Sequence, residues 1–193
     1  YDFNLFNGSV LVAEKGEIIY EDAMGLANRE LGVENEVNTI FHLGSITKQF
    51  TAMLILQLVE KGQLDLEATV NTYLPNYPYV GGDQISIHHL LTHSAGIPRF
   101  RLEVIGHQYE PLELLEMWKY EKLDFEPGTR CVYSNPAYFL LGVIIEEVSQ
   151  KPFDQVLKEN ILDPLGMQDT GIDNQHALLE NRASPYTKIG NDY

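Results

Sequence analysis

The chain has 193 residues, of which 44% are hydrophobic and 21% are charged, and its formal net charge is −15. This composition is ordinary for a globular protein, and the length suits one domain or slightly more. Phosphate backbones and anionic lipid surfaces repel so acidic a surface, so we expect no nucleic-acid partner. No apolar run reaches the roughly 18 residues of a membrane span, so no transmembrane segment is predicted.

The first pattern along the chain is that of two short strands. Residues 8–23, "GSVLVAEKGEIIYEDA", read as a β-hairpin that turns at Lys15-Gly16. An isolated hairpin is marginally stable in water. We therefore expect these strands to need a larger sheet or a covering helix.

A long apolar run follows the hairpin. The helix expected here begins at Ser45 and ends at Gly62, where a glycine suits the position after a helix. The run from Phe50 to Val59 is apolar almost all round, which predicts a central helix covered on most sides.

From Asp65 onward the pattern indicates several short helices. Ser86 caps one of them and Pro111 begins another, "PLELLEMWKY". Asn135-Pro136 begins "AYFLLGVIIEEVSQ", with the asparagine expected as N-cap and the proline at the first helical position. "FDQVLKENIL" is the last predicted helix. No strand pattern follows that would complete a sheet, so we expect an α/β layer interrupted by a helical region and continued outside this chain.

Ser45 and Lys48 are the first candidate catalytic pair. Their i, i+3 spacing places both side chains on one helix face. A serine hydroxyl becomes a good nucleophile when a neighbouring base takes its proton, and a lysine at a helix start among apolar side chains can be that base. The Ser45 backbone N–H at the same helix terminus can donate to an oxyanion. The alternative is that Ser45 caps the helix while Lys48 points into solvent.

Tyr133 and Asn135 form a second candidate pair. They lie two residues apart in an extended stretch, so their side chains can project the same way. A phenol beside a lysine can relay a proton, and an amide can bind a substrate amide. The alternative is a packed tyrosine followed by an N-cap. Either motif is short enough to occur by chance.

The histidines offer a competing motif. His89 and His93 have the i, i+4 spacing of helical zinc ligands, but Leu90 stands where the zincin motif has glutamate, and no third ligand is apparent. We therefore predict no metal site and no cofactor, and expect structural histidines.

Together these stretches resemble the superfamily of serine β-lactamases and penicillin-binding proteins, in the branch of class C β-lactamases, D-Ala-D-Ala carboxypeptidases and esterases. The resemblance rests on "FHLGSITKQFTA", "LDLEATVNTYLP", "ISIHHLLTHSAGIP", "FEPGTRCVYSNPAYFLLGVIIEEVSQKPF" and "ENILDPLGMQDTG", which occur in family order. It implies an antiparallel sheet flanked by helices, with a helical subdomain, an α/β plus all-α fold that is cut here before the later strands. The implied division is 1–64 and 176–193 in the α/β domain and 65–175 in the helical subdomain.

The resemblance also assigns roles. Ser45 is the acylated nucleophile and its N–H an oxyanion donor, Lys48 is its proton acceptor or electrostatic partner, Tyr133 is the second acid or base, and Asn135 binds substrate. The expected function is hydrolysis of D-alanyl peptides, β-lactams or esters, which are small-molecule or peptide substrates. A periplasmic or extracellular location is implied by the family, and Cys131, the only cysteine, leaves the compartment open.

The chain departs from the family pattern in one respect that bears on activity. The third motif, a Lys/His-Thr/Ser-Gly strand, does not occur in the sequence. We therefore expect the isolated chain to be inactive and the C-terminal portion of the same protein to be a partner. The alternatives are a non-catalytic binding or regulatory relative, and a fragment that is active only with its complement.

Overall fold

The computed structural model describes residues 6–75, 81–98, 122–173 and 178–186. By its contacts the chain divides into two units, Tyr1–Gly44 with Ile172–Tyr193 and Ser45–Gly171, and each is described by itself. The helix expected to begin at Pro111 lies outside the described residues. The predicted domain boundaries refer to the complete fold, of which this chain is one part. They stay a prediction.

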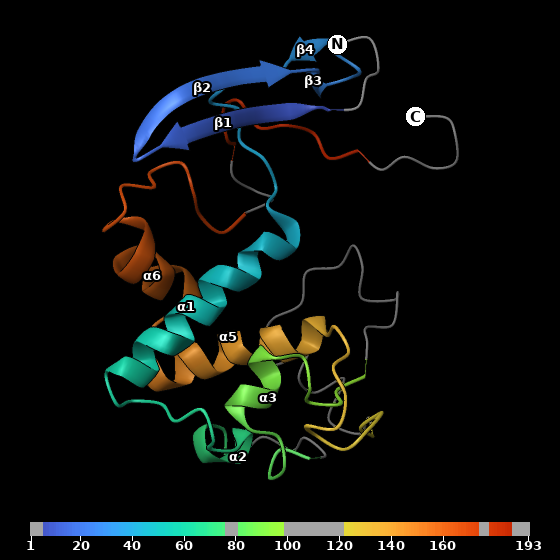
Figure 1. Cartoon of the computed structure of the whole chain (residues 1–193), viewed down its shortest axis with the longest axis vertical. Coiled ribbons are helices and arrows are strands. Elements are labelled where there is room, and N and C mark those ends of the chain that lie inside the picture. The colour runs from blue at the N-terminus through green and yellow to red at the C-terminus, as the bar shows by residue number, and fades with distance from the viewer. Residues whose placement is uncertain (1–5, 76–80, 99–121, 174–177, 187–193) are drawn as a thin grey trace. The chain divides into compact units, whose positions relative to one another are not determined.

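The first unit contains the predicted hairpin, drawn in blue in Figure 1. β1 (Gly8–Glu14) and β2 (Glu17–Met24) pair antiparallel, which confirms this prediction. Lys15 and Gly16 turn the chain with φ of 52° and 87°, the left-handed conformations that a two-residue hairpin turn favours. Two shorter strands form a second antiparallel pair, β3 (Leu26–Asn28) and β4 (Val33–Glu34).

The hairpin carries exposed apolar side chains on both faces. Ile18 and Ile19 of β2 are 59% and 61% exposed, and adjacent residues of a strand point to opposite faces. On β1, Leu11 is 54% exposed. Among the described residues, these exposed side chains agree with the expectation that the two strands need a larger sheet or a covering helix.

A segment late in the chain returns to the first unit. Ile40 and Arg182 form an isolated parallel β-bridge, with the Ile40 N–H donating to the Asn181 carbonyl at 2.9 Å. The Ser184 N–H donates to the Ala27 carbonyl at 2.8 Å. Residues 141 and 157 positions apart are thus joined by backbone hydrogen bonds.

The second unit is helical. A 3₁₀ turn, η1 (Gly44–Ile46), leads into α1 (Thr47–Glu60), close to the predicted span of 45–62. The other described helices are α2 (Val70–Tyr73), α3 (Ile87–Leu91), α5 (Asn135–Ser149), α6 (Phe153–Leu157) and a π-helical turn, η3 (Lys158–Leu162). Within the described part of the chain, no helix is long and apolar enough to cross a membrane.

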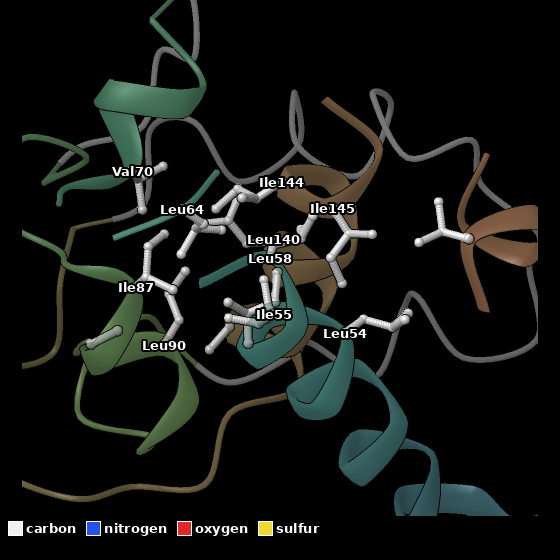
Figure 2. Packing of buried hydrophobic residues seen from close by; sticks show 14 of the residues in the cluster. Leu54, Ile55, Leu58, Leu64, Val70, Ile87, Leu90, Leu140, Ile144 and Ile145 are labelled. Carbon is white, nitrogen blue, oxygen red and sulfur yellow. The ribbon is translucent and has the colours of Figure 1, made fainter. Parts of the chain in front are cut away.

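The core of this unit lies where α1, α3 and α5 meet (Figure 2). Side chains from all three helices are almost completely inaccessible to solvent, among them Ile55, Leu90 and Ile144. Full burial of such a side chain contributes about 1.5–3 kcal/mol. The core thereby fixes α1 against α5, the two helices that carry the candidate site at their N-terminal ends.

Helix α1 is less covered than its sequence predicts. Its buried side chains are Thr51, Leu54, Ile55 and Leu58. Met53 and Leu56 point away from this core and are 51% and 47% exposed. In the described part of the chain, α1 packs on one side only, so the expected cover on most sides is not reached.

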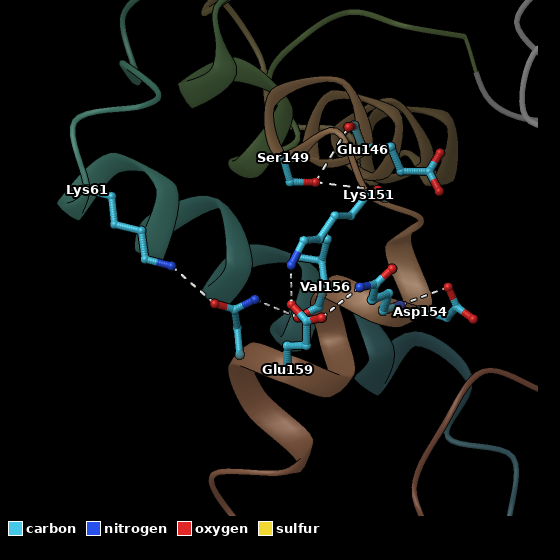
Figure 3. Close-up of polar contacts among 9 residues, drawn as sticks. Lys61, Glu146, Ser149, Lys151, Asp154, Val156 and Glu159 are labelled. Carbon is cyan, nitrogen blue, oxygen red and sulfur yellow. Dashed lines mark hydrogen bonds and ion pairs between the residues drawn. The ribbon is translucent and has the colours of Figure 1, made fainter.

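Polar contacts join the C-terminal end of α1 to η3 (Figure 3). Lys61 Nζ donates to Asn160 Oδ1 at 3.1 Å, and Gln57 Nε2 donates to the Asn160 carbonyl at 3.3 Å. Lys151 pairs with Glu159 at 2.6 Å. Exposed ion pairs of this kind contribute at most about 1 kcal/mol each, so these bonds orient η3 while the apolar core supplies the stability.

Candidate active site

Ser45 lies in the turn η1, and Lys48 lies in the first turn of α1. Lys48 Nζ is 3.4 Å from Ser45 Oγ, within hydrogen-bonding distance. The two side chains thus face one another, as their spacing predicts. Ser45 is exposed and Lys48 is half-buried.

Ser45 does not serve as the helix cap. The N-cap position of α1 is Ile46, and no side chain caps this terminus. Ser45 Oγ is instead bonded to Lys48 Nζ and to the Tyr133 hydroxyl, which is 2.5 Å away. The alternative prediction, in which Ser45 caps the helix and Lys48 points into solvent, is therefore wrong.

Tyr133 reaches Ser45 from the extended segment that precedes α5. Its side chain is 43% exposed. The interaction with Lys48 and the hydrogen bond with Ser45 lower the pKa of the Tyr133 phenol. A positive charge and a hydrogen-bond donor both favour the phenolate, and this is the physical cause of the shift.

Asn135 is not the N-cap of α5, contrary to prediction. Ser134 occupies that position, and its Oγ accepts from the Ala137 N–H. Asn135 is the first helical residue, and its Oδ1 accepts a hydrogen bond of 2.7 Å from Lys48 Nζ. Both serine and asparagine are good caps, and here the serine caps the helix while the asparagine amide is directed to the lysine.

The ammonium group of Lys48 lies among polar and aromatic groups. Its Nζ is 4.8 Å from the ring centroid of Tyr133 and 5.6 Å from that of Tyr138, distances that suit cation–π contacts. Among the described residues, no carboxylate lies within ion-pair distance of it. The charge of Lys48 is therefore directed at the tyrosine and the serine rather than neutralised by an acidic side chain.

The histidines bind backbone groups. His89 Nδ1 accepts from the Ser86 N–H within the capping box of α3, and His93 Nδ1 accepts from the Ser134 N–H, each at 3.2 Å. His93 lies beyond the end of α3, so the two histidines do not share a helix face. No group of three possible metal ligands occurs among the described residues.

Three residues of this site were not predicted as such. Ser134 is the cap, Tyr138 contributes the second ring beside Lys48, and His93 packs against Tyr133. Tyr138 lies one helical turn after Asn135, and this spacing indicates that the two side chains share a face of the helix. The place of His93 depends on where α3 ends, which its sequence pattern does not show.

A serine hydroxyl, a phenol of lowered pKa, a lysine and an amide thus lie together in one exposed site. Such an arrangement can deprotonate a hydroxyl and stabilise charge beside it. The resemblance noted in the sequence can now be set against known proteins.

Residues 5–193 match the family model described as Beta-lactamase. The chain is 37% identical to penicillin-binding protein 4* of Bacillus subtilis, over 91% of this chain and 40% of that protein. It is 33% identical to esterase EstB of Burkholderia gladioli, over 94% of this chain and 50% of that protein. It thus spans about half the length, or less, of these curated relatives.

A solved structure of a penicillin-binding protein from Bacillus halodurans aligns with 97% of this chain and 60% of that chain, at a TM-score of 0.84 and 28% identity. The chain belongs to the Beta-lactamase family, whose serine hydrolases include penicillin-binding proteins and esterases. The predicted fold class, a partial antiparallel sheet with helices of the β-lactamase type, is confirmed.

Proposed function

We propose that the protein is a serine hydrolase that forms an acyl-enzyme at Ser45. The observation that carries the proposal is the position of Ser45 Oγ, 2.5 Å from the Tyr133 hydroxyl and 3.4 Å from Lys48 Nζ. A serine in contact with a proton acceptor and a cation is the arrangement that nucleophilic catalysis needs.

In this proposal Tyr133 is the immediate proton acceptor. It is nearer to Ser45 Oγ than Lys48 is, and its pKa is lowered by Lys48 and Ser45. Burial raises the pKa of the neighbouring Tyr138, and a charge on Tyr133 raises it further. Two phenols with pKa values moved apart are typical of a site in which one of them ionises.

The acylation step transfers one proton and one acyl group. The Tyr133 phenolate takes the proton of Ser45, and the oxygen of Ser45 bonds to the substrate carbonyl carbon. The leaving group departs with the proton held by Tyr133, and water later hydrolyses the ester and restores Ser45. The Ser45 N–H serves as one oxyanion donor.

Lys48 and Asn135 complete the site. The ammonium group stabilises the phenolate and holds the Asn135 amide through its Oδ1. This bond leaves the NH₂ group of Asn135 to donate to a substrate carbonyl, since no described residue accepts from it. Asn135 is therefore proposed to bind the amide or ester next to the bond that is cleaved.

The substrates we propose are D-alanyl peptides, β-lactams or simple esters. The names of the relatives, penicillin-binding protein and esterase, support the β-lactam and ester classes. We also propose that further residues of the same protein cover the apolar hairpin and supply the second oxyanion donor. Support for this comes from the exposed side chains of β1 and β2 and from relatives about twice as long.

A second candidate function is binding without turnover. It applies if no Lys/His-Thr/Ser-Gly strand occurs elsewhere in the protein, since these 193 residues contain none. A regulatory relative would retain the binding site for a peptide or β-lactam and would not release a product.

A substrate panel distinguishes these functions. We expect the full-length protein to release product from a chromogenic ester, a chromogenic cephalosporin or a D-alanyl-D-alanine peptide, and Ser45→Ala to remove this activity. Ser94→Ala is the matched control and is expected to leave it unchanged. Binding of the three compounds without product release would favour the regulatory alternative.

A further inference from the structure

The Tyr133 hydroxyl must stay against Ser45 although its side chain is exposed and precedes a helix rather than lying in one. An extended segment has no hydrogen bonds of its own, so its geometry depends on neighbours. The groups that hold residues 132–134 therefore decide how well the phenol is placed.

One residue bonds the backbone on both sides of Tyr133. The His93 carbonyl accepts from the Val132 N–H at 2.8 Å, and His93 Nδ1 accepts from the Ser134 N–H at 3.2 Å. The same residue thus fixes the positions directly before and after the tyrosine.

The imidazole ring of His93 also packs against aromatic rings. Its centroid is 4.7 Å from that of Tyr133 and 5.0 Å from that of Tyr138. Tyr138 is itself anchored, because its hydroxyl donates to the Leu91 carbonyl at 3.0 Å. The ring of His93 therefore contacts both the anchored ring of Tyr138 and the ring of Tyr133, whose hydroxyl contacts Ser45.

The backbone of His93 is adapted to this position. Its φ is +57°, a conformation that is uncommon outside glycine and that histidine, asparagine and aspartate adopt more often than other residues. This turn directly after α3 allows the carbonyl and the side chain of one residue to reach the same segment. A sparsely populated conformation of this kind often occurs near functional sites.

His93 is suited to accept a hydrogen bond. Partial burial lowers its pKa first and the charge of Lys48 lowers it further, and together they outweigh the backbone hydrogen bond at Ser134, which raises the pKa. Its ring contacts the rings of Tyr133 and Tyr138, and Lys48 is the cation whose charge acts on it. Only an unprotonated Nδ1 can accept from the Ser134 N–H.

We propose that His93 is a positioning residue that holds the Tyr133 phenol against Ser45 by bonding the backbone on both sides of it. The inference rests on the proposed function, in which Tyr133 takes the proton of Ser45. It assigns to the last histidine of "HHLLTH" a role in placing the base rather than in binding metal.

The decisive comparison is between two variants in the full-length protein. Asparagine tolerates the left-handed conformation and carries an oxygen close to the position of Nδ1, whereas glycine tolerates the conformation and lacks the acceptor. We expect His93→Gly to slow acylation by about 100-fold, the effect of displacing a reacting group by about 1 Å. His93→Asn should stay within about 10-fold of the unchanged protein, with KM little altered in both. His88→Gln, at an exposed position of α3, is the matched control.

Two outcomes would overturn the inference: acylation by His93→Gly at the rate of the unchanged protein, or equal losses in the glycine and asparagine variants. If His93→Gly does not fold, the ¹⁵N spectrum of the histidine rings in the unchanged protein decides. We expect an unprotonated Nδ1 of His93 at neutral pH, and a protonated Nδ1 would overturn the inference. An unchanged protein that is never acylated would contradict the proposed function instead, and the spectrum would still test the hydrogen bond.

Discussion

Replacement of Tyr133 by phenylalanine is expected to lower the rate of acylation at Ser45 by about 10²–10⁴-fold, the usual contribution of a general base. The change removes the hydroxyl that lies 2.5 Å from Ser45 Oγ. It keeps the ring that contacts His93 and Lys48. Stopped-flow measurement of acylation by a chromogenic ester would give the rate.

Tyr138→Phe is the control for this variant because it makes the same chemical change on a neighbouring ring. The Tyr138 hydroxyl donates to the Leu91 carbonyl, and the net stability of such a bond is about 1 kcal/mol. We expect a small loss of stability and little loss of acylation. Equal losses of acylation in both variants would contradict the role of Tyr133.

Replacement of Lys48 by methionine is expected to slow acylation at neutral pH by about 10²–10³-fold, as loss of one electrostatic stabiliser does. Lys48 lowers the pKa of Tyr133, and in the proposed mechanism the phenolate is the reactive form. Acylation by the unchanged protein should therefore fall as pH decreases through this lowered pKa. Without Lys48 the pKa of Tyr133 returns toward its ordinary value, so the fall should begin at higher pH.

The pH profile of acylation for the two proteins measures this shift. Lys61→Met is the control on the same helix, since Lys61 bonds Asn160 and lies at the other end of α1. Its profile should match that of the unchanged protein. A Lys48→Met protein with a slower rate but an unmoved profile would leave Lys48 a structural role only.

The parts of the fold that sequence predicts are those set by local rules. Lys15-Gly16 supplies the left-handed turn of the hairpin, and the apolar run around Ile55 supplies the core face of α1. The bridge between Ile40 and Arg182 could not be predicted, because no local pattern indicates which distant segments pair.

In the candidate site, too, the sequence predicts what local geometry determines and misses what distant contacts determine. The spacing of Ser45 and Lys48 on one face follows from helix geometry. The cap of α5 was assigned one residue late because serine and asparagine cap equally well, and the choice depends on Lys48 binding Asn135. His93 was read as part of a helix, yet α3 ends at Leu91 and the chain turns there. Contacts between separate segments, which sequence spacing does not encode, decide both cases.

The measurement that tests the central claim most directly is intact mass spectrometry of the full-length protein after incubation with a fluorophosphonate and, separately, with a fluorescent penicillin. Attack by Ser45 Oγ on the fluorophosphonate forms an oxygen–phosphorus bond and releases fluoride. We expect one adduct per chain, located on Ser45 by peptide mapping and absent from Ser45→Ala. A label on another serine, or one that persists undiminished in Ser45→Ala, would contradict the account.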